Sequence, residues 1–118
     1  MKRNILRQLK DIQFQAEKLL KGSPDLSAIR TFSQYSAEIN RFLLEEIDLP
    51  DVHQLVYQIP PIPYEVGINK RSLFMTVLPS VLWYWYYERQ IVEEAQEGIQ
   101  IARGKYSSIE FMLKNYLA

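Results

Sequence analysis

Residues 80–117 read SVLWYWYYERQIVEEAQEGIQIARGKYSSIEFMLKNYL. Positions at intervals of three or four along this stretch are apolar except for Glu88, and this is the spacing of one face of an α-helix. Because two further stripes of this kind precede it, the sequence predicts an all-α fold, a small helical bundle. The stripe consists of Val81, Trp85, Val92, Ala95, Ile99, Ala102, Tyr106, Ile109, Leu113 and Tyr116.

A proline at position 79 interrupts the pattern just before this stretch. Since proline lacks an amide hydrogen and clashes with the preceding turn, Pro79 should kink the long C-terminal helix or begin a new one at Ser80. The segment from Ser72 to Tyr87 is also rich in residues that favour strands. A central strand would lose a hydrogen bond at Pro79, however, and no other segment offers a partner strand. Helix is therefore favoured over strand.

A second break is expected at Gly104. Just after it, Ser107 and Glu110 form the pattern of a capping box, in which each side chain satisfies the other's backbone amide. The C-terminal region is therefore predicted as a long helix near 80–103 and a short helix near 107–117.

The N-terminal half predicts an antiparallel helical hairpin over residues 2–47. The first helix should stop at Gly22, a usual helix terminator. Ser23 can cap the second helix, Pro24 suits its first position, and Pro50 disfavours helix in the residue before it. The first apolar stripe is Ile5, Leu9, Ile12, Ala16 and Leu19, and the second is Leu26, Ile29, Phe32, Tyr35, Ile39, Phe42 and Leu43.

Residues 51–66 are expected as a short helix capped by Asp51, followed by a proline-rich connector. Three prolines in four positions exclude helix and favour a stiff, extended backbone. Such a run either straps the core or is read by a partner's aromatic groove, and the strap is favoured. The connector residues retained as candidate partner contacts are Pro60, Pro61, Pro63 and Tyr64.

The 118 residues have the size of one domain, expected to span 1–118 and to end with the two helices in 69–117. The 14 basic and 14 acidic side chains cancel, so the chain lacks the basic excess that phosphate binding favours. The absence of cysteine excludes disulfides, thiolate metal sites and cysteine nucleophiles. The N-terminus has no signal-peptide pattern, and a cytoplasmic location is expected.

Charge is unevenly distributed along the chain. Residues 1–22 hold six basic and two acidic side chains, a net charge of +4, whereas residues 23–66 hold two basic and seven acidic ones, a net charge of −5. The favoured interpretation is a basic helix lying beside an acidic helix. The alternative is a basic face on the first helix that binds nucleic acid or anionic lipid.

Catalytic motifs are scarce. His53 is the single histidine of the chain, and its position fits a surface or capping residue. Glu93, Glu94 and Glu97 form an acidic group, but the Glu-x-x-His pairs of di-iron bundles are missing. The four glycines form no phosphate-binding pattern. We therefore expect no enzymatic activity, no cofactor and no metal site.

Five aromatic residues follow one another from Trp83 to Tyr87. The uncharged window around them, residues 72–87, would span about 24 Å as a helix, less than the roughly 30 Å of a bilayer core. A small domain has limited material to cover rings that bury roughly 150–250 Å² each. Since Tyr and Trp are enriched in interface hot spots, Trp83, Tyr84 and Tyr87 are predicted to bind a partner.

The expected function is a non-enzymatic protein–protein interaction or assembly module. It would act as a homo-oligomer or as a subunit of a larger complex, through an aromatic-rich interface. Two alternatives remain: a nucleic-acid-associated accessory protein that uses the basic first helix, and a membrane-peripheral protein that uses the aromatic residues.

Overall fold

The computed structural model describes residues 2–22, 24–64 and 80–117, and within the last range it describes side chains from Glu88 to Tyr116. This part of the chain forms helices and no strands, so the predicted all-α bundle is confirmed. The helices are α1 (Lys2–Lys21), α2 (Leu26–Glu46), α3 (Pro50–Tyr57) and α4 (Ser80–Leu117).

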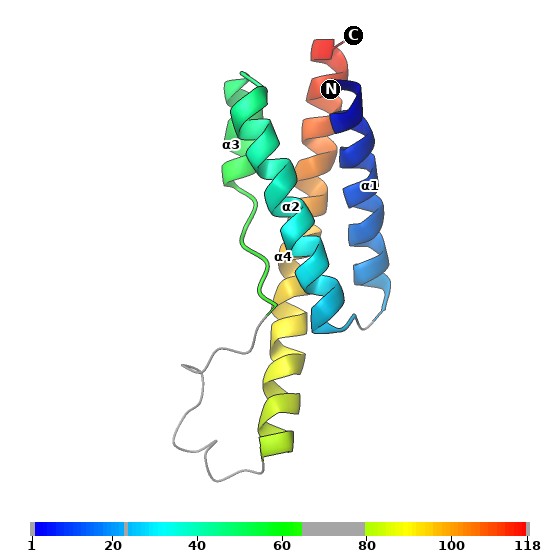
Figure 1. The fold of residues 1–118 in the computed structure, drawn as a ribbon, viewed down its shortest axis with the longest axis vertical. Coiled ribbons are helices and arrows are strands. Elements are labelled where there is room, and N and C mark those ends of the chain that lie inside the picture. The colour runs from blue at the N-terminus through cyan, green and yellow to red at the C-terminus, as the bar shows by residue number, and fades with distance from the viewer. Residues whose placement is uncertain (1, 23, 65–79, 118) are drawn as a thin grey trace.

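The helices alternate in direction along an elongated molecule of 59 × 25 × 19 Å (Figure 1). α1 and α2 form the predicted antiparallel hairpin, and α3 and the connector return alongside α2 and α4. α4 then runs antiparallel to α1, its most extensive packing partner. The ends of α1 and α4 that are nearest the chain termini lie at the same end of the bundle (Figure 1).

The core is built from the stripes that the sequence predicts. Each of the four helices contributes buried apolar residues to one cluster, and Ile62 of the connector joins it. The cluster therefore follows the helical repeat from α1 through to the last turns of α4. Its fully buried members include Ile5, Leu9, Ile12, Ala16, Ile29, Leu43, Val52, Ala95, Ile99, Ala102, Ile109 and Leu113.

Two helix starts differ from the predicted ones. Asp25, rather than Ser23, caps α2, because its side chain accepts a hydrogen bond of 2.8 Å from the Ala28 amide. α3 begins at Pro50, one residue before the predicted Asp51 cap, and the residue at its N-cap makes no side-chain capping bond. A proline fits this first position because the amide that it lacks would have no partner within the helix.

The predicted break at Gly104 is wrong, because α4 is one helix of 38 residues. Gly104 adopts no positive φ that would end a helix. Its neighbours Ala102 and Tyr106 are both fully buried, so packing on either side holds the helical backbone through the glycine. A local helix terminator is thus overridden by the core stripe that continues past it.

The predicted capping box is also wrong. Ser107 lies in the middle of α4, where amides already bond within the helix. The Glu110 carboxylate instead accepts a hydrogen bond of 3.1 Å from Gln13 Nε2 on α1. It also lies 3.4 Å from Lys114 Nζ, one turn further along α4. Glu110 therefore joins two helices rather than beginning one.

The strand alternative is excluded for residues 80–87, which are helical. Pro79 and the rest of that segment lie outside the described residues, as does the predicted kink.

Candidate functional site

The start of α4 extends beyond the other three helices (Figure 1). Gln96 Nε2 donates hydrogen bonds of 3.0 Å to the carbonyl oxygens of Leu19 and Gly22, so Gln96 lies level with the end of α1. The 16 residues of α4 that precede Gln96 have a length of about 24 Å. We call residues 80–90, which precede the buried side chains of Ile91 and Ala95, the projecting segment.

The projecting segment carries the predicted contact residues Trp83, Tyr84 and Tyr87. Their backbone is helical, as expected, whereas their side chains lie outside the described part of the structure. Among the side chains described from Glu88 onwards, Ile91 is buried and Arg89 is exposed.

The proline-rich connector lies against both α2 and α4. Ile62 is buried, and a Cβ atom added to Gly98 of α4 would lie only 2.9 Å from its Cδ1 atom. Ser33 Oγ on α2 donates a hydrogen bond of 3.4 Å to the Ile62 carbonyl. Of the four candidate contact residues, Pro61 is exposed and the others, Pro60, Pro63 and Tyr64, are half-buried. The connector thus buries Ile62 and leaves one edge of its chain exposed to solvent.

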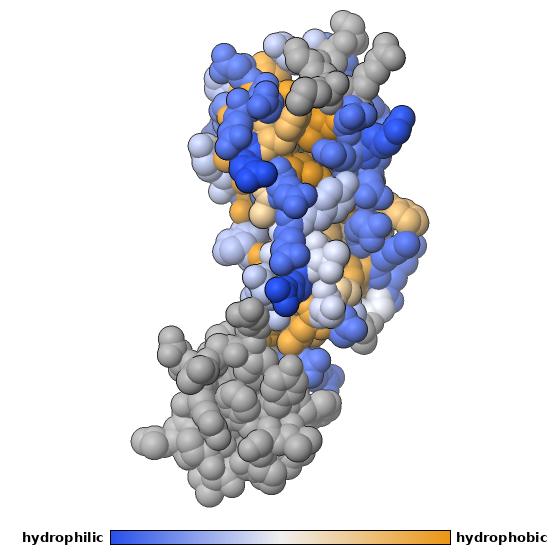
Figure 2. Space-filling model, viewed as in Figure 1, coloured by the Kyte–Doolittle hydropathy of each residue, from blue (hydrophilic) through white to orange (hydrophobic). Residues whose placement is uncertain are grey.

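A groove that the sequence did not predict runs between α1 and α2. It has two hollows, of about 370 and 240 Å³, with Tyr35 lining both. The Tyr35 hydroxyl donates a long hydrogen bond of 3.5 Å to the Gln8 carbonyl across the groove. Figure 2 shows apolar surface between the polar outer sides of the helices. The larger hollow is lined by Asp11, Gln15, Leu19, Ala28, Thr31, Phe32 and Tyr35, and the smaller by Gln8, Tyr35, Glu38, Ile39, Arg41, Phe42, Glu45 and Glu46.

The groove is negatively charged. Among the side chains that the structure describes, the carboxylates of Asp11, Glu38, Glu45 and Glu46 line it together with one cation, that of Arg41. The pKa of Tyr35 is raised to about 12, chiefly by burial and in addition by a hydrogen bond to Asp11 and by the charges of Asp11 and Glu38. The Tyr35 phenol therefore stays protonated and neutral beside the carboxylates of Asp11 and Glu38.

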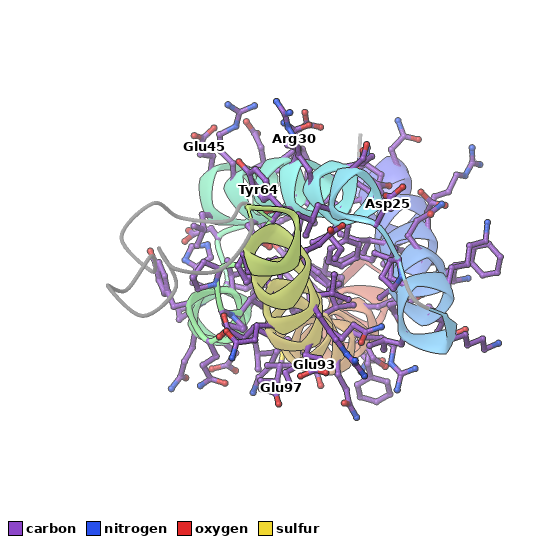
Figure 3. The ribbon with its side chains drawn as sticks, turned by 90° about the horizontal axis from the view of Figure 1, so that it is seen from below. Asp25, Arg30, Glu45, Tyr64, Glu93 and Glu97 are labelled. Atoms are coloured by element: carbon purple, nitrogen blue, oxygen red, sulfur yellow. The ribbon has the colours of Figure 1, made fainter. Side chains whose placement is uncertain are left out.

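His53 and the acidic group on α4 lie outside the lining of the groove. His53 Nε2 hydrogen-bonds the carbonyl oxygen of Ile47, the C-cap of α2, which fits the capping role expected for it. Glu93 and Glu97 point outward from α4 (Figure 3). No group of three His, Asp or Glu side chains in the described ranges could hold a metal ion. None of the helices in these ranges has the length and apolar character that crossing a bilayer requires.

No protein-family model, curated protein or solved structure matches this chain. Functional inference therefore rests on its own residues.

Proposed function

We propose that the protein is a non-enzymatic interaction or assembly module, and that the projecting segment of α4 is its principal contact surface. The observation that carries this proposal is the position of that segment, which extends beyond α1, α2 and α3 (Figure 1). Five consecutive helical positions take up more than one full turn, so residues 83–87 face every direction around the helix. Aromatic residues at such positions are well suited to burial against a partner.

Self-association and partner binding are tested together. Light scattering is expected to give the wild-type protein a mass above the 14.0 kDa of one chain, or a pull-down from native lysate is expected to recover a stoichiometric partner. The double variant Trp83→Ser/Tyr87→Ser should lose that mass increase or that partner.

The matched control removes two aromatic residues elsewhere. Tyr57 and Phe111 are 75% and 68% exposed on α3 and α4, and Tyr57→Ser/Phe111→Ser should leave the association intact. A monomer without a partner, or equal behaviour of the two double variants, would rule out the projecting segment as the contact surface. Circular dichroism confirms that both variants retain their helices.

A second candidate function is nucleic-acid binding by α1. Its support is that Arg7, Lys10, Lys18 and Lys21 are all exposed on this helix. Lys18 Nζ lies 4.6 Å from the ring centre of Phe14, which is itself 54% exposed. Binding of single- or double-stranded nucleic acid that weakens steeply with salt would favour this function. No binding at low salt would exclude it.

A further inference from the structure

We propose that the groove between α1 and α2 binds an amphipathic helix of a protein partner, one with apolar residues along one face and Lys or Arg beside them. This site is separate from the projecting segment of α4 and does not depend on the function proposed for it. The floor, the rim and the length of the groove all fit such a helix.

The floor of the groove offers apolar contacts that the bundle leaves incomplete. Phe42 in the smaller hollow and Leu19 in the larger one are only half-buried, although both pack against the core. Tyr35 separates the hollows and is half-buried too. Two apolar side chains of a partner, one for each hollow, would complete the burial of these residues.

The rim of the groove selects for positive charge. Asp11, Glu38, Glu45 and Glu46 are all exposed, and Arg41 is the opposing charge among the lining residues. Complementary charges across an interface fix the choice of partner and speed its encounter. Lys or Arg side chains at the edges of the apolar face would therefore match the rim, and Asp or Glu side chains would be repelled.

The shape of the groove favours a helix as the occupant. Its walls are side chains of two helices, whose backbone amides and carbonyls already bond within those helices. An extended peptide would find few backbone partners there, whereas a helix satisfies its own backbone. The lining residues of α2 run from Ala28 to Glu46, about 27 Å, which corresponds to a partner helix of about 18 residues.

The probe for this site is a fluorescein-labelled, 18-residue Leu/Lys peptide whose leucines fall on one helical face. Fluorescence anisotropy should show saturable binding to the full chain, weakened by added salt. A Leu/Glu peptide of the same pattern should not bind. Absence of saturable Leu/Lys binding, or equal binding of both peptides, would overturn the proposal.

Charge reversal locates the site. Glu38→Lys/Glu45→Lys should weaken binding of the Leu/Lys peptide by about tenfold or more, because like charges then meet across the groove. The matched control is Glu93→Lys/Glu97→Lys, which changes the net charge equally on exposed positions of α4 that point outward (Figure 3). An equal loss in both variants would show general charge attraction and overturn the proposal.

A steric variant tests the floor without changing charge. Thr31 is exposed and lines the larger hollow, so Thr31→Trp should fill the hollow and weaken peptide binding while circular dichroism stays unchanged. Trp83→Ser/Tyr87→Ser should bind the peptide as the wild type does, which separates this site from the projecting segment. A different result would point to a second copy of the chain as the occupant. In that case the wild-type protein would self-associate without binding the peptide, and Glu38→Lys/Glu45→Lys would abolish the self-association. The proposal would then be wrong.

Discussion

The hydroxyl of Tyr106 lies inside the bundle, where α4 packs against α2. It donates a hydrogen bond of 2.6 Å to Asn40 Oδ1 and bonds the hydroxyl of Ser36. Tyr106 is fully buried and Ser36 is buried with it, so water cannot replace these bonds. A single aromatic residue of the core stripe thus also fixes how α4 is aligned with α2.

Tyr106→Phe should lower the free energy of unfolding by about 1–3 kcal/mol, because the buried hydroxyl of Ser36 and the half-buried amide oxygen of Asn40 lose their bonds to Tyr106. Urea unfolding followed by circular dichroism measures the change. The control Tyr57→Phe removes a hydroxyl from a side chain that is 75% exposed and should have no effect. Equal stability of the two variants would mean that the buried hydroxyl contributes nothing.

Burial raises the pKa of Tyr106 to about 12, although its hydrogen bonds with Ser36 and Asn40 act in the opposite direction. In the unfolded chain a tyrosine ionises near pH 10. Between about pH 10 and 12 the unfolded chain therefore loses a proton that the folded protein keeps. The stabilisation is complete below pH 10 and is lost as the pH rises toward 12.

The expected result is a decline in stability of about 1.4 kcal/mol per pH unit from Tyr106 over this range. The difference between wild type and Tyr106→Phe should accordingly shrink from pH 10 upward in urea unfolding experiments. Tyr57→Phe should follow the wild-type curve. A constant difference across this range would mean that the folded protein releases the Tyr106 proton as readily as the unfolded chain.

At the scale of single elements, α4 shows how packing overrides local sequence signals. Its two described glycines differ in their surroundings: a Cβ atom at Gly104 would meet nothing within 4 Å, whereas one at Gly98 would meet Ile62 at 2.9 Å. Gly104 is exposed and Gly98 is buried beneath the connector. The first glycine therefore only weakens the helix, and the second makes room for the connector.

Gly104→Ala should raise the free energy of unfolding by about 0.5–1 kcal/mol, because alanine is the better helix former and nothing obstructs it. Gly98→Leu should lower it by about 1–3 kcal/mol, because the larger side chain displaces Ile62 from the core. Thermal unfolding monitored by circular dichroism compares the variants with the wild type. A loss of stability in Gly104→Ala would indicate that the helix does break there.

The elements that the sequence predicts well are those with a repeated apolar pattern. The stripe through Leu9 and Ile12, like that through Ile99 and Leu113, predicts both a helix and its buried side. Capping motifs predict less well, since Ser107 and Glu110 match a helix start but lie where the core stripe continues. A capping motif marks a helix start only where the packing of neighbouring residues allows the helix to be interrupted.

The groove between α1 and α2 could not be predicted because it depends on the distance between two helices. Tyr35 and Phe42 belong to the apolar stripe of α2, and by sequence alone they belong in the core. In the structure they are half-buried, because α1 packs more extensively on α4 than on α2. The acidic composition of residues 23–66 is the sequence feature that relates to the groove. It predicts negative charge on this part of the surface but does not predict a hollow.

At the scale of the whole molecule, the first and last helices hold each other in place. Gln13 and Glu110 are joined by a hydrogen bond although they lie 97 positions apart in the chain. Arg103 of α4 and Glu17 of α1 approach to 4.0 Å on the same seam, but with side chains 40% and 48% exposed the pair is screened by solvent and contributes little. The stability of this seam therefore comes mainly from its buried apolar residues.

Leu9→Ala should lower the free energy of unfolding by about 2–5 kcal/mol, since Leu9 is fully buried in the core that α1 shares with α4. Because the termini pair with each other, the whole chain should unfold in one transition. Circular dichroism and the fluorescence of the two tryptophans, Trp83 and Trp85, should then give the same midpoint. Tyr57→Ala, at an exposed site, is the control.

Two separate midpoints would contradict this expectation. They would show that the projecting segment, which holds both tryptophans, unfolds independently of the bundle.

The outer ends of α1 and α4 lie together at one pole of the molecule, and the first turns of α4 form the opposite pole (Figure 1). A tag, fluorophore or surface linker attached at either terminus is thus held most of the 59 Å long axis away from the aromatic residues. Immobilised chains would direct the start of α4 away from the supporting surface. Two fluorophores, one at each terminus, would lie close together in the folded protein and move far apart on denaturation. Energy transfer between them would therefore report whether the protein is folded.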